Sequence, residues 1–407
     1  MKKTTITVLL LAILSASASL AATPVAGPQA AFLVDPVTGS VLRCEGGTLA
    51  VSKTGGLTQF TTLAQESTDL VSPRDAKNGT IEVLTGQFAD ENDAGNPVIR
   101  STSGQVLLAR GLSAAVDRVL TAESNLSWDG AAVWQTAYTP NPAPVGDGPQ
   151  PAERGTFTYV SIRIADQRSF EQTLAPGMGG AEALGFDDIL IALQTGGILR
   201  TKAGKLLWKL DSMPGGSWRI QDVDLKKSAV LVIDEDGGLA AVDLNAGSLL
   251  WRWHAPSSAA SVRAFLLQTR TQATMDANRA RVLEEADELE AEGWIEQGGS
   301  ADQVLRTEYG IVGARFTPDG RVLVVGNPLA PWAAIFDPAS QALAGRELID
   351  ALALAGHAVA AAGFRGRSVG LGRDFVILPA SSDRTPGLTL LFKSPEGWYT
   401  TPLSALD

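Results

Sequence analysis

Residues 189–210 read ILIALQTGGILRTKAGKLLWKL, and residues 230–253 read VLVIDEDGGLAAVDLNAGSLLWRW. Both stretches begin with an apolar run and pass through a glycine pair into a second apolar segment. Both then reach a turn glycine that is followed four residues later by a tryptophan. The two tryptophans, Trp208 and Trp251, are 43 positions apart. The chain therefore contains an internal repeat whose length is typical of architectures that stack small β-sheets.

The repeat predicts short antiparallel strands joined by tight turns. Alternating apolar positions such as Leu231 and Ile233 can face one side of a strand. Asp-Gly pairs supply the positive φ angles that tight hairpins need. One four-stranded sheet of this kind leaves both faces uncovered, so several sheets must pack against one another. We therefore expect an all-β protein, a single β-propeller of four-stranded blades.

Weaker copies of the repeat support this interpretation. The first aligns Asp35 and Gly39 with Asp243 and Gly247. After the two interruptions described below are set aside, a register of about 43 residues predicts about seven blades, with eight as the alternative. We expect strands from the two ends of the chain to share one blade, because closure removes exposed edges. The weaker copies lie at residues 32–45, 98–111, 314–326, 332–348, and 374–380 with 388–393.

Seven residues are expected to carry the repeat as structural positions. The glycines and the aspartate belong to the turns, and the tryptophans fill the wedge between neighbouring sheets. These residues are Gly197, Gly204, Trp208, Gly238, Asp243, Gly247 and Trp251.

Three segments do not follow the repeat. Residues 1–21 combine a basic start, an apolar run and a small-residue cleavage site, which is typical of a secretory signal peptide. Residues 22–407 are then the propeller domain, interrupted by a Pro-rich loop at 139–152. The apolar spacing over residues 258–297 predicts an inserted amphipathic helix.

The net charge, the single cysteine and the apolar segments of the chain indicate its compartment and exclude one class of partner. Loss of the signal peptide would change the net charge from −11 to −13, and an acidic surface repels phosphate backbones, so no nucleic acid is expected. The only cysteine, Cys44, is expected to be a buried small hydrophobe, with a reactive thiol as the alternative. Because no cysteine lies at the cleavage site and no second long apolar segment follows, we expect a secreted or periplasmic protein without a lipid anchor or transmembrane segment. We expect a monomer.

The turn that runs from Asp243 to Trp251 resembles the repeat of pyrroloquinoline-quinone-type (quinoprotein-type) β-propellers, with Ala241, Asp243, Gly247 and Trp251 matching position for position. Residues 314–326 resemble the hairpin of WD-type propellers. The quinoprotein-type resemblance implies either a quinone-dependent dehydrogenase or a non-catalytic relative that binds protein. The dehydrogenases of the larger type carry adjacent cysteines and a calcium-binding cluster. The single Cys44 and the lack of matching ligands therefore place the resemblance with the non-catalytic branch.

No residues are expected to serve catalysis, to bind a cofactor or to ligate a metal. The two histidines, His254 and His357, are isolated, so neither a zinc site nor a Ser-His-Asp triad is expected. Asp187–Asp188 and Asp234–Asp236 lie near predicted hairpins, where charged clusters are usually solvated.

These observations predict an exported, non-catalytic binding or scaffold protein of the bacterial cell envelope. Its protein or polymer partner would contact one face of the ring and the inserted helix. The acidic residues of that helix form a possible partner surface, with a merely solvated helix face as the alternative. The alternative function is an enzyme that uses the central channel, either a quinone-dependent dehydrogenase or a metal-assisted lactonase or carbohydrate-active enzyme. The acidic residues of the helix are Glu284, Glu285, Asp287 and Glu288.

Overall fold

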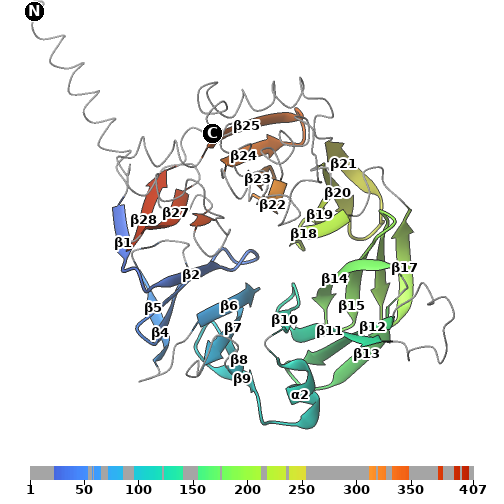
Figure 1. Cartoon of the computed structure of the whole chain (residues 1–407), viewed down its shortest axis with the longest axis horizontal. Helices are drawn as coiled ribbons and strands as arrows, with labels where there is room; N and C mark the ends of the chain where they lie inside the picture. The colour runs from blue at the N-terminus through green and yellow to red at the C-terminus, as the bar shows by residue number, and fades with distance from the viewer. Residues whose placement is uncertain are drawn as a thin grey trace, which may run out of the picture. The chain divides into compact units, whose positions relative to one another are not determined.

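Seven four-stranded antiparallel sheets make up the protein in the computed structural model (Figure 1). In every sheet, strands that follow one another along the chain also lie side by side. The fold is therefore all-β, a seven-bladed β-propeller, and the predicted count of seven blades is confirmed. The structure describes residues 23–53, 57, 59–65, 72–85, 96–121, 123–140, 155–174, 177–211, 218–234, 238–253, 311–317, 320–326, 332–347, 375–378, 389–394 and 397–402.

Five blades belong to one compact unit, which spans residues 31–255 and 314–316. Within this unit the first strand of each blade lies on the inner side of the arc and the fourth strand on the outer side (Figure 1). Blade 1 consists of β2 (Ala31–Val34), β3 (Val41–Glu45), β4 (Thr48–Ser52) and β5 (Thr61–Gln65). Blade 2 consists of β6 (Ser72–Lys77), β7 (Thr80–Thr85), β8 (Asn96–Ser101) and β9 (Val106–Ala109). Blade 3 consists of β10 (Asn125–Leu126), β11 (Ala132–Pro140), β12 (Gly155–Arg163) and β13 (Ser169–Thr173). Blade 4 consists of β14 (Met178–Gly185), β15 (Asp188–Leu193), β16 (Ile198–Lys202) and β17 (Lys205–Leu210). Blade 5 consists of β18 (Trp218–Asp224), β19 (Ala229–Asp234), β20 (Leu239–Asp243) and β21 (Leu249–Trp253).

The second compact unit holds the last two blades, apart from residues 314–316. In blade 7 the N-terminal strand β1 pairs with β28, so the two ends of the chain share one blade, as expected. The indole nitrogen of Trp398 on β28 donates a hydrogen bond of 2.7 Å to the carbonyl of Ala30, just after β1. Blade 6 consists of β22 (Ile311–Phe316), β23 (Val322–Gly326), β24 (Trp332–Asp337) and β25 (Ala342–Glu347). Blade 7 consists of β26 (Phe375–Leu378), β27 (Thr389–Ser394), β28 (Gly397–Pro402) and β1 (Thr23–Ala26).

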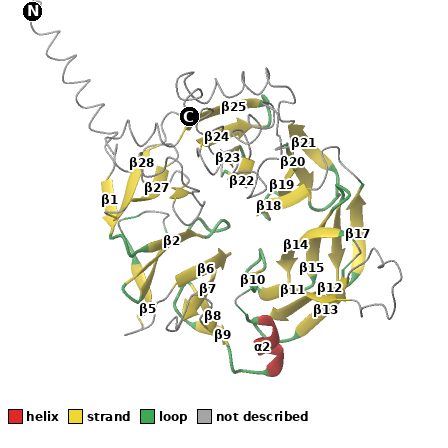
Figure 2. Ribbon diagram, viewed as in Figure 1, coloured by secondary structure: helices red, strands yellow, loops and turns green. Residues whose placement is uncertain are grey.

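One short helix, α2 (Ala114–Val119), lies between blades 2 and 3 (Figure 2). It is not the predicted amphipathic helix, because residues 258–297 lie outside the described residues. The signal peptide lies outside them as well. Of the predicted Pro-rich loop, Thr139 and Pro140 instead end β11, where they pair with Thr156 and Gly155.

The tryptophan of the repeat joins blade 4 to blade 5. The Trp208 indole nitrogen donates a hydrogen bond of 2.7 Å to the Leu244 carbonyl. Its ring lies against the turn that Asp243 organises, where the Asp243 carboxylate accepts hydrogen bonds from two turn N–H groups. Gly247 closes this turn at a φ of +66°, and a Cβ added there would lie 2.5 Å from the Trp208 ring. The contact between the blades therefore requires glycine at position 247.

Two aspartates on first strands join neighbouring blades through the backbone. Asp75 on β6 accepts a hydrogen bond of 3.1 Å from the Leu126 N–H of blade 3. Asp222 on β18 accepts one of 2.7 Å from the Phe316 N–H of blade 6. Each carboxylate also accepts a bond from the next N–H of its own strand, and each lies at a β-bulge. In both blades an aspartate at a bulge of the first strand therefore binds the backbone of the next blade, an arrangement that the sequence repeat does not reveal.

Glu82 is a buried acid at the contact between blades 2 and 3. It lies opposite Asp75 in the strand register and is 0% exposed. One carboxylate oxygen accepts a hydrogen bond of 2.8 Å from the Ser124 hydroxyl and lies 3.5 Å from Arg74, while the other has no hydrogen-bond partner among the described residues. Burial raises the pKa of Glu82 to about 7, and Asp75 adds a smaller upward effect, whereas Ser124 and Arg74 oppose the shift.

We expect Gly247→Ala to destabilise the protein by about 2–4 kcal/mol, because it adds a clash with Trp208 to the strain of a positive φ. The matched variant is Gly204→Ala, in the equivalent turn of blade 4. Its φ is +76°, but no atom lies within 4 Å of the added Cβ. Strain alone predicts a loss of about 1–2 kcal/mol there. Urea unfolding measures both losses, and equal losses would contradict the Trp208 contact.

We expect the stability of the protein to fall as the pH rises through the titration of Glu82. The folded state raises this pKa from its usual 4.5, so below pH 4.5 the penalty for burying the charge is absent, and it grows until about pH 7. Glu82→Gln should remove about 2 kcal/mol of the decrease in unfolding free energy between about pH 5.5 and about pH 8. Burial also raises the pKa of Asp222 and Glu182, and both remain in the variant. Identical pH profiles of variant and wild type, from urea unfolding, would contradict the assignment.

Candidate functional site

The turns between the first and second strands of blades 1 to 4 are tied together. The Asp35 carboxylate in blade 1 accepts hydrogen bonds of 3.1 and 2.7 Å from the N–H groups of Asn78 and Gly79 in blade 2. The Asn78 side chain in turn donates one of 2.9 Å to the Asp129 carbonyl of blade 3. The Asp129 N–H donates to the Leu184 carbonyl of blade 4. We call the surface formed by these turns and by the matching turn of blade 5, residues 225–228, the turn face.

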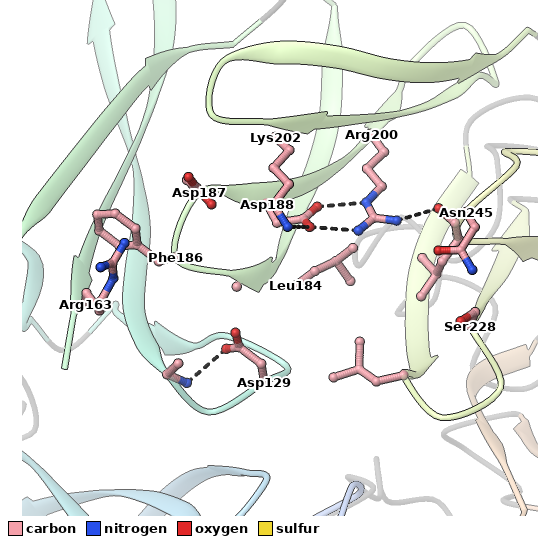
Figure 3. A pocket seen from close by; sticks show the side chains of 14 residues that line it. Asp129, Arg163, Leu184, Phe186, Asp187, Asp188, Arg200, Lys202, Ser228 and Asn245 are labelled. Carbon is pink, nitrogen blue, oxygen red and sulfur yellow. Dashed lines mark hydrogen bonds and ion pairs between the residues drawn. The ribbon is translucent and has the colours of Figure 1, made fainter. Parts of the chain in front are cut away.

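A pocket of about 370 Å³ opens on the turn face among blades 3, 4 and 5 (Figure 3). Leu184, Phe186 and Leu225 supply its apolar surface. Ionic and polar side chains supply the rest, so the pocket can recognise a charged guest. Those that bear on its chemistry are Asp129, Arg163, Asp187, Lys202, Ser228 and Asn245.

One ion pair in the wall of the pocket is structural. Asp188 on β15 accepts two parallel hydrogen bonds of 2.8 and 2.7 Å from the Arg200 guanidinium on β16, the next strand of the same sheet. The remaining Arg200 nitrogen donates one of 2.6 Å to the Leu244 carbonyl of blade 5. The Lys202 ammonium lies 3.3 Å from the same Asp188 carboxylate. Asp188 is therefore fully occupied and unavailable to a guest.

Two other carboxylates remain open to the pocket. One Asp129 oxygen accepts hydrogen bonds from the Ser127 hydroxyl, at 2.6 Å, and from the Ala131 N–H, at 2.9 Å. The other points toward Gly185, where an added Cβ would lie 2.7 Å from it. Asp187, at the turn between β14 and β15, makes no side-chain hydrogen bond or ion pair with any described residue. Figure 3 shows both side chains among those that line the pocket.

Arg163 forms one side of the pocket but is already paired. Its guanidinium lies 4.4 Å from the centre of the Phe186 ring and 3.4 Å from the Asp166 carboxylate. The Phe186 carbonyl accepts a hydrogen bond of 2.5 Å from the Ser161 hydroxyl, which holds this turn against blade 3. The pocket therefore has rigid walls and, in Asp129 and Asp187, two acceptors for a guest.

The structure places the predicted repeat residues in the blades rather than in the pocket. Gly197 directly precedes β16, Gly204 and Gly247 close turns, and Gly238 donates to the Asp234 carboxylate. Trp208 and Trp251 lie on the fourth strands of blades 4 and 5 and are half-buried. The possible partner surface at Glu284, Glu285, Asp287 and Glu288 lies outside the described residues, as do both histidines.

Three expectations about acidic turns need correction. Asp188 and Asp234 are buried, not solvated, because Arg200 pairs with the first and Gly238 and Arg252 contact the second. Asp35 belongs to a turn between first and second strands, whereas Asp243 lies between third and fourth strands. The shared sequence pattern specifies how a turn closes, and it does not specify where in the blade that turn lies.

Sequence reasoning missed most of the pocket. Asp129, Arg163 and Lys202 come from different hairpins, and none belongs to a recognisable motif. Arg200 and Lys202 alternate along one strand, which was a weak signal of a charged strand face. Within the described part of the chain, no group of three His, Cys, Asp or Glu side chains could hold a metal ion.

The comparisons with known proteins concern the fold. No family model matches the chain, and no curated protein matches its sequence. Among solved structures, the C-terminal WD40 domain of Sif2 is 11% identical with a TM-score of 0.41, and the match covers 80% of this chain and 74% of that one. Sqt1 from Saccharomyces cerevisiae is 9% identical with a TM-score of 0.41, covering 95% and 98%. Hsv2 from Kluyveromyces lactis is 10% identical with a TM-score of 0.39, covering 78% and 75%.

The quinoprotein-type family is not confirmed, because no family model matches the chain. One of the similar structures is a WD40 domain, and WD-type is the other resemblance that the sequence suggested. Among the helices that the structure describes, none has the length and apolar character that a membrane crossing needs.

We expect Arg200→Met to destabilise the protein by about 3 kcal/mol or more, because it leaves Asp188 buried without its main partner. Adding Asp188→Asn should restore at least half of the loss. The control is Arg118→Met, which removes an exposed ion pair with Glu171 of 2.6 Å and should cost about 0–1 kcal/mol. A double-mutant cycle by urea unfolding measures the coupling, and additive losses would contradict a structural pair.

Proposed function

We propose that this protein is a non-catalytic, binding β-propeller whose turn face holds a basic segment of a protein partner in the pocket among blades 3, 4 and 5. The observation that carries the proposal is a difference in pairing. The basic side chains of the pocket already contact carboxylates, whereas two of its carboxylates keep oxygens without a partner among the described residues. Arg163 and Arg200 already contact carboxylates, and Lys202 shares Asp188 with Arg200. Asp129 and Asp187 keep acceptor oxygens for a guest.

An arginine or lysine side chain fits this arrangement. A guanidinium carries five N–H donors in a planar fork and can bind two separate carboxylates at once. The apolar surface of Leu184 and Leu225 suits the methylene stem of such a side chain. A volume of about 370 Å³ accepts one or two side chains, so the guest is an extended segment rather than a folded domain.

The charge of the whole chain favours the same class of partner. A net charge of −11 attracts basic segments from a distance and raises their association rate. The acidic run that contains Glu284 and Glu288 would extend this attraction along the predicted helix of residues 258–297. Because residues 1–21 resemble a secretory signal, we place the partner among proteins or charged polymers of the cell envelope.

The test is a peptide array probed with the full chain, followed by affinity measurements on the peptide that binds best. We expect the array to select peptides with an arginine or lysine. Asp187→Asn should lower the affinity for the selected peptide about tenfold or more, as measured by fluorescence anisotropy. The substitution removes a charged acceptor and keeps the shape of the side chain.

The matched control is Asp211→Asn, which removes an exposed carboxylate outside the pocket that pairs with Lys209 at 2.8 Å. It should leave the affinity unchanged. Selection of peptides without basic residues, or equal affinities for wild type and Asp187→Asn, would overturn the proposal.

A further inference from the structure

Four leucines on two neighbouring outer strands are exposed. Leu206 and Leu207 on β17 are 59% and 51% exposed, and Leu249 and Leu250 on β21 are 42% and 50% exposed. They occupy the same offsets in the two best copies of the repeat, directly before Trp208 and Trp251. Side chains of this size are usually buried, so a matched pair of exposed Leu-Leu steps calls for a reason.

A β-bulge turns the leucines outward. On β17, Leu206 pairs with Thr201 and Trp208 with Arg200, which leaves Leu207 as the extra residue. On β21, Leu249 pairs with Val242 and Trp251 with Ala241, which leaves Leu250 as the extra residue. A bulged edge disfavours pairing with an added strand, so recognition at this place depends on side chains.

The two Leu-Leu steps belong to one surface. The hydrogen bond of 2.7 Å from Trp208 to the Leu244 carbonyl joins β17 to the hairpin of β20 and β21. Both steps directly follow a turn between third and fourth strands, so both lie at the same end of their blades, at the outer edge of the turn face. We call Leu206, Leu207, Leu249 and Leu250 the leucine rim.

Basic side chains lie beside the leucine rim, and two of them, Lys209 and Lys227, pair with Asp211 and Asp224. The segment 194–210 contains Arg200, Lys202, Lys205 and Lys209 and no acidic residue. Lys205 lies next to Leu206, is exposed, and makes no ion pair with any described residue. Lys226 and Lys227, in the first turn of blade 5, are exposed on the turn face as well. This local charge is opposite to the net charge of −11 of the chain.

We propose that the leucine rim and its lysines contact the surface of an anionic lipid membrane. Protein interfaces are depleted in lysine, and their strongest contacts rarely use leucine. Lysine and leucine together suit a lipid surface, where the apolar chains enter the interface and the ammonium groups reach anionic headgroups. A second copy of the chain is disfavoured, because symmetric contact would bring the two sets of lysines together.

The contact is confined to this edge and fixes the orientation of the protein. The chain has a net charge of −11, so an anionic membrane repels it at a distance, and contact through the leucine rim favours one orientation. The proposal does not depend on the pocket, because Lys205 and Leu206 do not line it.

The test is co-sedimentation of the full chain with vesicles of phosphatidylcholine that contain about 30% phosphatidylglycerol, compared with pure phosphatidylcholine. We expect binding to the anionic vesicles and much weaker binding to the neutral ones. The double variant Lys205→Gln/Leu206→Ser should lower the partition coefficient on anionic vesicles about tenfold, since one lysine alone accounts for about fivefold.

The matched control is Val106→Ser/Arg110→Gln, which removes one exposed apolar side chain at the start of β9 and one exposed cation directly after β9, in blade 2. It should bind vesicles as the wild type does. Urea unfolding of both variants establishes that they are folded. No binding to anionic vesicles, equal losses in the two variants, or a concentration-dependent dimer that Leu206→Ser abolishes would each overturn the proposal.

Discussion

A blade of this protein is apolar on both faces, and neighbouring blades must cover those faces. Every described residue of β19 is buried, and all of β15 is buried except its last residue. Strands that are buried on both sides leave no solvated face, so a single blade would expose a large apolar surface. The contact of Trp208 with the turn of the next blade closes this interface at its outer edge, where diverging sheets leave the widest gap. Turn geometry and packing are thus coupled, because the same Gly247 closes a turn and admits a tryptophan.

Carboxylates also join neighbouring blades. Carboxylates that bond to the N–H groups of the next blade, as Asp35 and Asp222 do, join blades without adding apolar area. Such groups are fully used in the structure. Asp187 differs, because it lies at an equivalent turn and has no described side-chain partner. A carboxylate without a described partner, in the same pocket as the open oxygen of Asp129, indicates a place where a guest completes the hydrogen bonding.

The sequence specified the blades better than it specified the site. The hairpins around Gly204 and Gly247, and the pairing of the two ends of the chain, follow from local turn chemistry and from closure. The burial of Asp188 could not be predicted in the same way, because it depends on Arg200 across a hairpin and on Leu244 in another blade. The pocket combines three blades that no motif relates. A turn pattern in the sequence predicts how one turn closes. The composition of a site depends on which turns lie next to one another in the fold, and local sequence does not determine that.

The turn face then divides into two regions with opposite charge. Its hollow offers carboxylates, and its outer edge on blades 4 and 5 offers lysines beside exposed leucines. For a distant partner, the electric fields of the two regions largely offset each other. Salt also screens both fields over about 10 Å at moderate ionic strength. At contact distance the two fields act separately, because the carboxylates of the hollow contact the basic guest and the lysines of the outer edge contact the membrane. A protein held at an anionic membrane by the leucine rim keeps the hollow of the turn face beside that membrane, where basic segments concentrate.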